Sequence, residues 1–316
     1  MRRRTSDFPE RIITMGNLGI CFVNPAPQIE PDYVTAMART CDQAGLHSLW
    51  TIDRIAYDNL EALTVLAAAA AVTERIRLGT SVLLSALRHP ALLAKTVATL
   101  DFLSNGRVTL GIGFGSRESD FTSVEVPWEH RGSRAAESLA LMKRLWTEEE
   151  VEHHGRFFDL HSTRFGPDTV QSPHPPIWMG GGAEPVLKRV GRFADGYICG
   201  SNAVHNFDAV WDKISAHARA AGRDPDSIEK AGLTFIAIND DKSKAVEACE
   251  NYLIRYYGKV RMDVEKYMLV GSADACADGI NRIFAGGLQT LIIGLAISDL
   301  AQLDAFVEKV LPQVEG

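Results

Sequence analysis

The sequence predicts a single (β/α)8 TIM barrel with an insertion between its fourth and fifth strands. From residue 17 onward, short apolar runs alternate with longer amphipathic stretches, which is the pattern of parallel strands joined by helices. Eight such pairs follow one another along the chain. The turn after the first strand, Asn24-Pro-Ala-Pro27, lacks the GxGxxG motif that opens a dinucleotide-binding sheet. An open α/β sheet is the alternative architecture.

Each expected strand is a short apolar run followed by a helical pattern. The strands are residues 18–23, 48–52, 76–84, 108–114, 177–180, 196–199, 233–238 and 290–295. The helices are residues 31–44, 60–73, 90–103, 134–146, 184–193, 207–221, 242–256 together with 273–284, and 300–311. Pro31 and Pro90 are expected at first helical positions, where a missing N–H costs nothing. Residues 151–160 alternate around Gly155 like a hairpin, and an insertion after a barrel strand is expected to shape the active site.

Composition and charge narrow the classes of partner. Of the 316 residues 46% are hydrophobic, enough for one large core, so we assign residues 16–316 to one domain preceded by a flexible tail, residues 1–15. The 33 basic and 40 acidic residues give a net charge of -7, which disfavours nucleic acid and anionic membranes and favours a small-molecule substrate. No apolar run is long enough to cross a bilayer.

The five cysteines predict neither a metal site nor a disulfide framework. They are odd in number, far apart and free of CxxC spacing, which favours buried thiols in a reducing, cytoplasmic compartment. They are Cys21, Cys41, Cys199, Cys249 and Cys276. A metal-dependent barrel hydrolase is disfavoured as well, because the chain contains no HxH sequence.

A stretch around the third and fourth strands carries the most specific motif. It runs Gly79-Thr-Ser-Val-Leu-Leu-Ser-Ala-Leu-Arg-His-Pro90 and, after a helix, Ser104-Asn-Gly-Arg-Val-Thr-Leu-Gly-Ile-Gly-Phe-Gly115. This stretch resembles the bacterial luciferase-like monooxygenase family, whose members use FMN or the deazaflavin coenzyme F420. In the F420-dependent branch the resemblance implies a cis peptide at Ser81-Val82, forming a bulge behind the cofactor ring, with Gly113 nearby. An ordinary strand end is the alternative.

Glycines after the fifth strand point to a phosphate site. Gly180, Gly181 and Gly182 precede an expected helix, where backbone N–H groups can approach an anion. The resemblance implies that these three glycines hold the cofactor phosphate and that Cys199 and Gly200 face the cofactor tail. A tight turn without a ligand is the alternative.

The family's acid and base are both absent. In its sugar-phosphate dehydrogenases, the resemblance implies a histidine base at the position of Arg54 and a glutamate acid at the position of Ser116. An arginine stays charged and cannot accept a proton, so Arg54 is not the base and the catalytic residue is unknown. We predict Asp53, Arg54 and Ser116 as substrate contacts. Asp53 is also predicted as a cofactor contact. His89 or His130 could replace the missing base, and Trp128 is a weaker candidate for the pocket.

These features together predict an F420-dependent oxidoreductase that moves a hydride to or from a small organic substrate. An FMN-dependent monooxygenase is the close alternative, and a non-catalytic binding barrel is the remote one. The family also implies a homodimer formed through helices near the second and third strands, where the alanine-rich residues 67–72 could pack closely.

Overall fold

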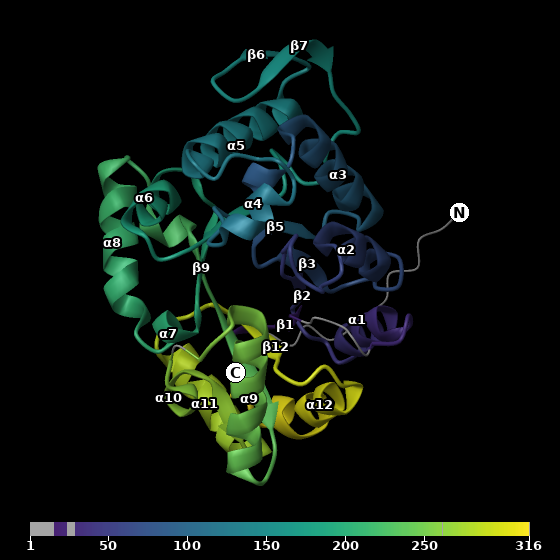
Figure 1. Cartoon of the computed structure of the whole chain (residues 1–316), viewed down its shortest axis with the longest axis vertical. Helices are drawn as coiled ribbons and strands as arrows, with labels where there is room; N and C mark the ends of the chain where they lie inside the picture. Colours follow the sequence, from purple (N-terminus) through teal and green to yellow (C-terminus); the bar gives the residue numbers. More distant parts are fainter. Residues whose placement is uncertain (1–15, 24–28, 261, 316) are drawn as a thin grey trace, which may run out of the picture.

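The computed structural model describes residues 16–23, 29–260 and 262–315. The expected N-terminal tail, residues 1–15, and the turn at Asn24 lie outside these ranges. Within them, the chain forms the predicted closed barrel, with helices arranged around it (Figure 1). No helix of the described part is both long and apolar enough to cross a membrane.

Eight parallel strands close the barrel in the order β1, β2, β3, β5, β8, β9, β10, β12 and back to β1. These strands are β1 (Asn17–Phe22), β2 (Ser48–Thr51), β3 (Arg77–Thr80), β5 (Val108–Gly113), β8 (Ile177–Gly180), β9 (Gly196–Cys199), β10 (Glu229–Ile238) and β12 (Thr290–Leu295). Two short strands add to the same sheet, β4 (Leu83–Leu84) against β5 and β11 (Leu269–Gly271) against β10. All eight predicted strands are therefore confirmed, and the open-sheet alternative is excluded.

Two large rings fill the interior of the barrel. Trp50 and Trp178 lie with their ring centroids 5.2 Å apart. Glycines on neighbouring strands make room for them, since a Cβ at Gly79 would come within 2.3 Å of the Trp50 ring and a Cβ at Gly196 within 2.5 Å of the Trp178 ring. The interior of the barrel is thus a packed core.

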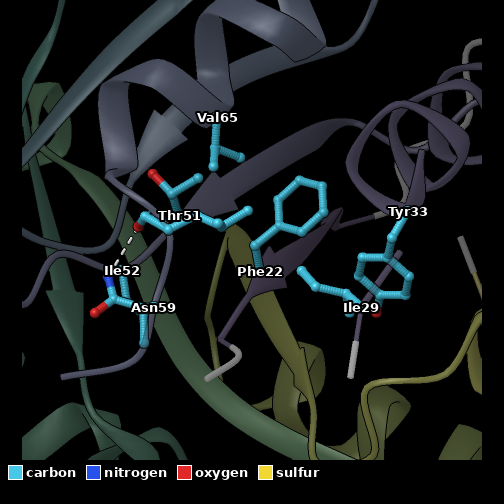
Figure 2. A pocket seen from close by; sticks show the side chains of 8 residues that line it. Phe22, Ile29, Tyr33, Thr51, Ile52, Asn59 and Val65 are labelled. Carbon is cyan, nitrogen blue, oxygen red and sulfur yellow. Dashed lines mark hydrogen bonds between the residues drawn. The ribbon is translucent and has the colours of Figure 1, made fainter. Parts of the chain in front are cut away.

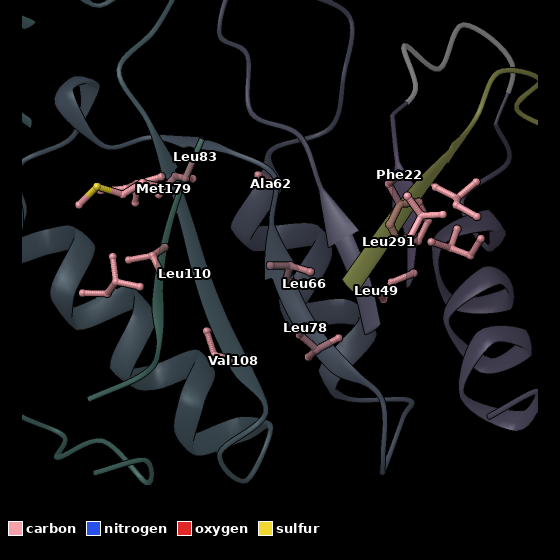
Figure 3. Packing of buried hydrophobic residues seen from close by; sticks show 14 of the residues in the cluster. Phe22, Leu49, Ala62, Leu66, Leu78, Leu83, Val108, Leu110, Met179 and Leu291 are labelled. Carbon is pink, nitrogen blue, oxygen red and sulfur yellow. The ribbon is translucent and has the colours of Figure 1, made fainter. Parts of the chain in front are cut away.

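The helices pack their apolar faces on the outside of the barrel. They are α1 (Tyr33–Gln43), α2 (Ala62–Ala70), α3 (Pro90–Leu103), α4 (Glu118–Thr122), α5 (Arg131–Thr147), α6 (Glu184–Phe193), α7 (Ser201–Val204), α8 (Phe207–Ala220), α9 (Lys242–Tyr257), α10 (Val264–Tyr267), α11 (Ala273–Ala285) and α12 (Leu300–Ala305). Figure 3 shows the layer between strands and helices, in which Leu78 and Val108 of the barrel lie near Leu66 of α2. These side chains are buried, as a barrel core requires.

Of the two helix starts predicted from prolines, one is confirmed and one is wrong. Pro90 is the first residue of α3, as expected, and the His89 side chain caps that helix by accepting from the Ala91 N–H. The prediction for Pro31 was wrong, because α1 begins at Tyr33 after Asp32. Proline fits a first turn but does not by itself fix the first residue of a helix.

Two regions contain elements beyond the eight strand–helix pairs. Of the elements in these regions, α5, the hairpin around Gly155 and α9 match the prediction, whereas α4, α10 and β11 were not predicted. Between β5 and β8 lie α4, α5 and an antiparallel pair, β6 (Glu150–His154) with β7 (Asp159–Arg164). This pair lies at the periphery, beyond α3 and α5 (Figure 1). The other region follows β10, where α9, α10 and β11 form an additional unit before α11. Side chains of α9 such as Tyr252 and Leu253 belong to the same apolar cluster as Phe235 of β10 and the interior tryptophans.

Candidate active site

One cleft of about 870 Å³ lies at the carboxyl ends of the barrel strands. It is lined by the segments after β2, β3, β5, β8 and β9 and by the C-terminal half of α9. All eleven site residues predicted from the sequence line it: Asp53, Arg54, Ser81, Val82, Gly113, Ser116, Gly180, Gly181, Gly182, Cys199 and Gly200. Enzymes with this fold carry their active sites at this face.

A second, smaller cavity lies beside the ends of β1 and β2. It has a volume of about 20 Å³, room for about one water molecule. Figure 2 shows the Phe22 ring between Val65 and Thr51 on one side and Ile29 and Tyr33 on the other. A third cavity, of about 860 Å³, lies beyond the end of β12 and is lined by residues such as Tyr33, Arg255 and Asp299. It contains none of the eleven predicted residues, so the cleft that they line is the candidate site for a cofactor and a substrate.

The floor of the cleft is formed by the bulge after β3. The Ser81-Val82 peptide is cis, as the resemblance implied. The Val82 side chain occupies the space between neighbouring strand ends, since a Cβ at Gly113 would lie 2.4 Å from its Cγ2 atom and a Cβ at Gly180 2.8 Å from its Cγ1 atom. Glycine at both positions is thus a packing requirement. The result is an apolar platform in the middle of the barrel mouth.

Asp53 holds this bulge in place. Its Oδ2 atom accepts hydrogen bonds from the Leu84 N–H at 2.9 Å and from Arg88 Nη1 at 2.5 Å, and its Oδ1 atom accepts from Arg88 Nη2 at 3.0 Å. Burial disfavours the Arg88 charge, but hydrogen bonds and the charge of Asp53 outweigh this effect and raise the pKa of Arg88. Both carboxylate oxygens of Asp53 are engaged, so it lines the cleft chiefly as a support for the Ser81-Val82 floor.

Arg54 is buried against one wall of the cleft. Its side chain is 7% exposed, and its Nε atom donates to Asp120 Oδ2 at 2.7 Å. Asp120 Oδ1 accepts the N–H groups of Ile55 and Ala56, so this carboxylate fixes the segment that follows β2. The Arg54 Nη1 atom has no hydrogen-bond partner among the described residues. Sequence reasoning found Arg54 but missed Asp120, which comes 66 positions later in the short helix α4.

The glycines after β8 form an open rim. Gly181 has φ +124, a conformation that L side chains rarely adopt, and a Cβ at Gly182 would meet no atom within 4 Å. Both residues are exposed, and the Ala183 N-cap of α6 makes no side-chain cap hydrogen bond. In the first turn of α6, Pro185 has no N–H, and the Val186 N–H donates to the Ala183 carbonyl at 2.8 Å. Gly200 at the end of β9 is exposed on the same side.

Aromatic residues of α9 form a further wall of the cleft, and sequence reasoning missed them. Tyr252, Tyr256 and Tyr257 line the cleft. The Arg117 guanidinium carbon lies 4.7 Å from the Tyr256 ring centroid and 4.9 Å from that of Tyr257. Burial raises the pKa of Tyr256 to about 12, against the opposing charges of Arg117 and Arg54. The i, i+4 spacing of the first two tyrosines places them on one face of the helix. It does not show that this face points toward the barrel mouth.

The two candidate histidines, His89 and His130, differ in position, and two further histidines lie at the periphery. His130 lines the cleft at the start of α5. His89 caps α3 with its ring against Phe158. His153 pairs with Glu137, and His154 pairs with Glu152 and Asp159 on the exposed β6–β7 pair. These three histidines occupy structural positions.

The segment between β5 and β8 contributes to the cleft only in part. Ser116, Arg117, Asp120 and residues 130–133 line it, whereas the residues of β6 and β7 do not. Trp128 packs on Phe121 at a centroid distance of 5.1 Å and lies under the Arg131 guanidinium rather than in the cleft. The expectation that this insertion shapes the site therefore applies to its first twenty residues, and the expectation for Trp128 was wrong.

Comparison with known proteins finds relatives that include enzymes named as oxidoreductases. Residues 18–290 match the luciferase-like monooxygenase family. The chain is 32% identical over 234 residues to an F420-dependent glucose-6-phosphate dehydrogenase of Kineococcus radiotolerans, covering 70% of this chain and 68% of that one. It is 26% identical over 289 residues to a 5,10-methylenetetrahydromethanopterin reductase of Methanolobus tindarius, covering 91% and 85%. A solved monooxygenase of Streptomyces bottropensis superposes with a TM-score of 0.81 at 25% identity, covering 94% of this chain and 99% of the other.

Proposed function

Because the chain belongs to the luciferase-like monooxygenase family, we propose that it is an oxidoreductase that binds coenzyme F420 in the cleft and transfers a hydride to or from a small organic substrate. What supports this is the convergence of the eleven predicted residues on a single cleft. Relatives from separate branches that are named for F420-dependent or methanopterin-linked redox chemistry add to it.

The residues of the cleft fit a flat heterocycle with an anionic tail. Val82 offers an apolar platform for a ring, and the Ser81 Oγ atom beside it is buried without a hydrogen-bond partner among the described residues. Gly182 and Gly200 leave open backbone at the rim, beside the N-terminal end of α6, and such a position suits a phosphate. Gly180, Gly181 and Gly182 would thus hold the phosphate, and Cys199 and Gly200 would face the tail.

When bound, F420 would supply the two-electron hydride chemistry, and the protein would bind, orient and shield the reactants. Neither Arg54 nor the exposed Ser116 can take a proton from an alcohol as a hydride leaves. We therefore propose reduction of an activated C=C or C=N bond, in which reduced F420 is oxidised as the substrate gains a hydride and a solvent proton. His130 lines the cleft and is the candidate base for alcohol chemistry.

The direct test compares two substrate panels. Oxidation of reduced F420 is followed with enones and imines, and reduction of F420 is followed with sugar phosphates and simple secondary alcohols. We expect turnover in the first panel. Efficient alcohol oxidation that survives both Arg54→Ala and His130→Ala would overturn the assignment of reaction direction.

The rim glycines give a test of cofactor placement. Gly181 is unsuited to a charge substitution, because its φ of +124 means that any side chain there would also strain the backbone. Gly182 is the cleaner position, because a side chain there meets open space. Gly182→Asp should weaken F420 binding at least about tenfold by charge repulsion, whereas Gly182→Ala should leave it nearly unchanged. Equal affinities for both variants would reject the phosphate site.

FMN-dependent monooxygenation is the second candidate, favoured by the similarity to the Streptomyces monooxygenase over nearly the whole chain. The same platform and rim would suit the isoalloxazine ring and phosphate of FMN. Substrate-dependent oxygen consumption with reduced FMN, but not with reduced F420, would favour this candidate.

We also propose a cytoplasmic homodimer, with residues 16–316 as one domain. Within the alanine-rich residues 67–72 only Ala69 and Ala70 are buried, whereas Ala68 and Ala71 are exposed but present little apolar surface. The outer face of α3 is the better interface, because Leu92, Phe102 and Leu103 are 67%, 64% and 58% exposed. All five cysteines are free and buried, which suits a reducing compartment.

A further inference from the structure

We propose that the substrate carries an anionic oxygen group, a carboxylate or a phosphate, and that Arg54 and Arg117 bind it against the aromatic wall of α9. This inference rests on the proposed function, because it assigns the opposite half of the cleft to the cofactor. It names a substrate class from charges and distances around Tyr256.

The first reason is an excess of positive charge in the cleft. Its charged lining consists of four arginines, Arg54, Arg117, Arg131 and Arg189, and two aspartates, Asp53 and Asp120. Both aspartates already have cationic partners, Arg88 and Arg54 respectively. In the described part of the chain, Arg117, Arg131 and Arg189 have no carboxylate within ion-pair distance. Cationic side chains that line a cleft without counter-ions favour an anionic ligand.

The second reason is the state of the Arg54 guanidinium. Its Nε end is satisfied by Asp120, while its Nη1 atom is buried and lacks a partner among the described residues. Leaving a donor of a charged group unpaired is costly, so such groups are usually found paired with an acceptor. Because Arg54 lines the cleft, a bound oxygen anion is the acceptor that this position lacks.

The third reason is that Arg54 and Arg117 converge on one ring. The Arg54 guanidinium carbon lies 5.5 Å and that of Arg117 4.7 Å from the Tyr256 centroid. Arg117 is further fixed by donating from Nη2 to the Tyr256 carbonyl at 3.1 Å. Two cations held by the same aromatic side chain form a preorganised pair. Tyr252 and Tyr257 beside them would contact the apolar part of the same substrate.

Arg54 lies away from the cofactor rim, because it follows β2 and the rim glycines end β8 and β9, three and four strands away around the closed barrel. Arg117 follows β5, which pairs with β8, but its guanidinium is held on α9 by the Tyr256 carbonyl. The Val82 platform packs at the ends of β5 and β8, against Gly113 and Gly180. A ring on that platform with its phosphate at the rim would thus leave Arg54 and Arg117 for the second reactant.

The test uses simple probes with one aromatic ring. Benzoate, phenyl phosphate and neutral benzamide are titrated by calorimetry into the full-length protein saturated with F420, at fixed ionic strength. We expect at least one of the two anions to bind at least about tenfold more tightly than benzamide, and whichever anion does so identifies the source of the charge. Arg117→Met should remove about tenfold of that preference without changing F420 affinity by more than about twofold.

Control variants keep the outcome interpretable. Arg54→Met is combined with Asp120→Asn, so that no buried carboxylate is left unpaired, and this double variant should lose the anion preference as Arg117→Met does. Arg156→Met changes net charge equally on a side chain outside the cleft lining and should have no effect. Equal binding of benzamide and both anions, or equal losses in the Arg156 variant, would overturn the inference. Failure of F420 to bind would instead reject the proposed function, and the anion titration would then be read on the protein without cofactor.

Discussion

Neutralising Asp120 should destabilise the protein, because the buried Arg54 guanidinium would lose its ion-pair partner. In Asp120→Asn the amide oxygen can still accept the Ile55 and Ala56 N–H groups, but the 2.7 Å ion pair with Arg54 is lost. The two side chains are 7% and 2% exposed, so little water can replace the lost partner. Breaking a buried pair on one side costs about 3–5 kcal/mol, and we expect about 3 kcal/mol here because the shape and the backbone hydrogen bonds are kept.

A double-mutant cycle isolates the charge effect. Arg54→Met alone should cost about 2 kcal/mol, because Asp120 keeps two backbone donors. In the double variant no cation is left unpaired. Adding Asp120→Asn to Arg54→Met should therefore cost only about 1 kcal/mol more. The free energies of unfolding are measured by urea titration, with tryptophan fluorescence and circular dichroism required to give the same transition. Glu148→Gln, which breaks the exposed pair with Arg144, is the control and should leave stability unchanged.

Additivity would refute this account. If Asp120→Asn costs less than about 1 kcal/mol, or if the double variant loses the sum of the single losses, the two groups do not interact as a buried pair. The segment after β2 would then be held by its backbone hydrogen bonds alone, and Arg54 would not be fixed against the aromatic wall.

Three further predictions address other parts of the molecule. Burial, assisted by the charge of Arg77, lowers the pKa of His47 to about 4 from 6.5. A lowered histidine pKa gives stability that is present above pH 6.5 and lost as pH falls toward 4. The free energies of unfolding from urea titrations at pH 7 and 4.5 should therefore differ by about 2 kcal/mol, and His47→Gln should reduce that difference. Leu92→Glu combined with Phe102→Glu should convert the dimer to a monomer in sedimentation experiments, and an unchanged mass would exclude the α3 interface. Arg88→Met should cost about 3 kcal/mol and weaken F420 binding, because Asp53 would lose the partner that fixes the floor of the cleft; full affinity in a folded variant would refute this role.

The fold could be predicted because its signals are local. Each barrel strand is a short apolar run, and parallel strands with crossover helices allow few arrangements. The motif around Ser81 and Val82 also located the floor of the cleft, because glycines at 113 and 180 are required by the packing of one side chain. Helix α1 began later than the proline signal indicated, since that signal is compatible with neighbouring starts.

The partners of the site residues could not be predicted, because they are far away in the sequence. Asp120 reaches Arg54 from a five-residue helix that carries no strong periodic signal. The tyrosines of α9 lie in a unit that resembles any amphipathic helix until its position over the barrel mouth is known. Asp53 was predicted as a ligand contact, but whether a carboxylate is free or already bound by Arg88 depends on tertiary geometry.

Side-by-side calorimetric titration of the purified protein with F420 and FMN shows which cofactor the cleft binds. We expect one F420 per chain with a dissociation constant on the order of micromolar, and FMN binding at least about a hundredfold weaker. Gly182→Asp should lower the F420 affinity, while Gly182→Ala should not. FMN binding as tight as or tighter than F420 would contradict the proposed use of F420 in favour of a flavin monooxygenase, and binding of neither would contradict it in favour of a barrel without a redox cofactor.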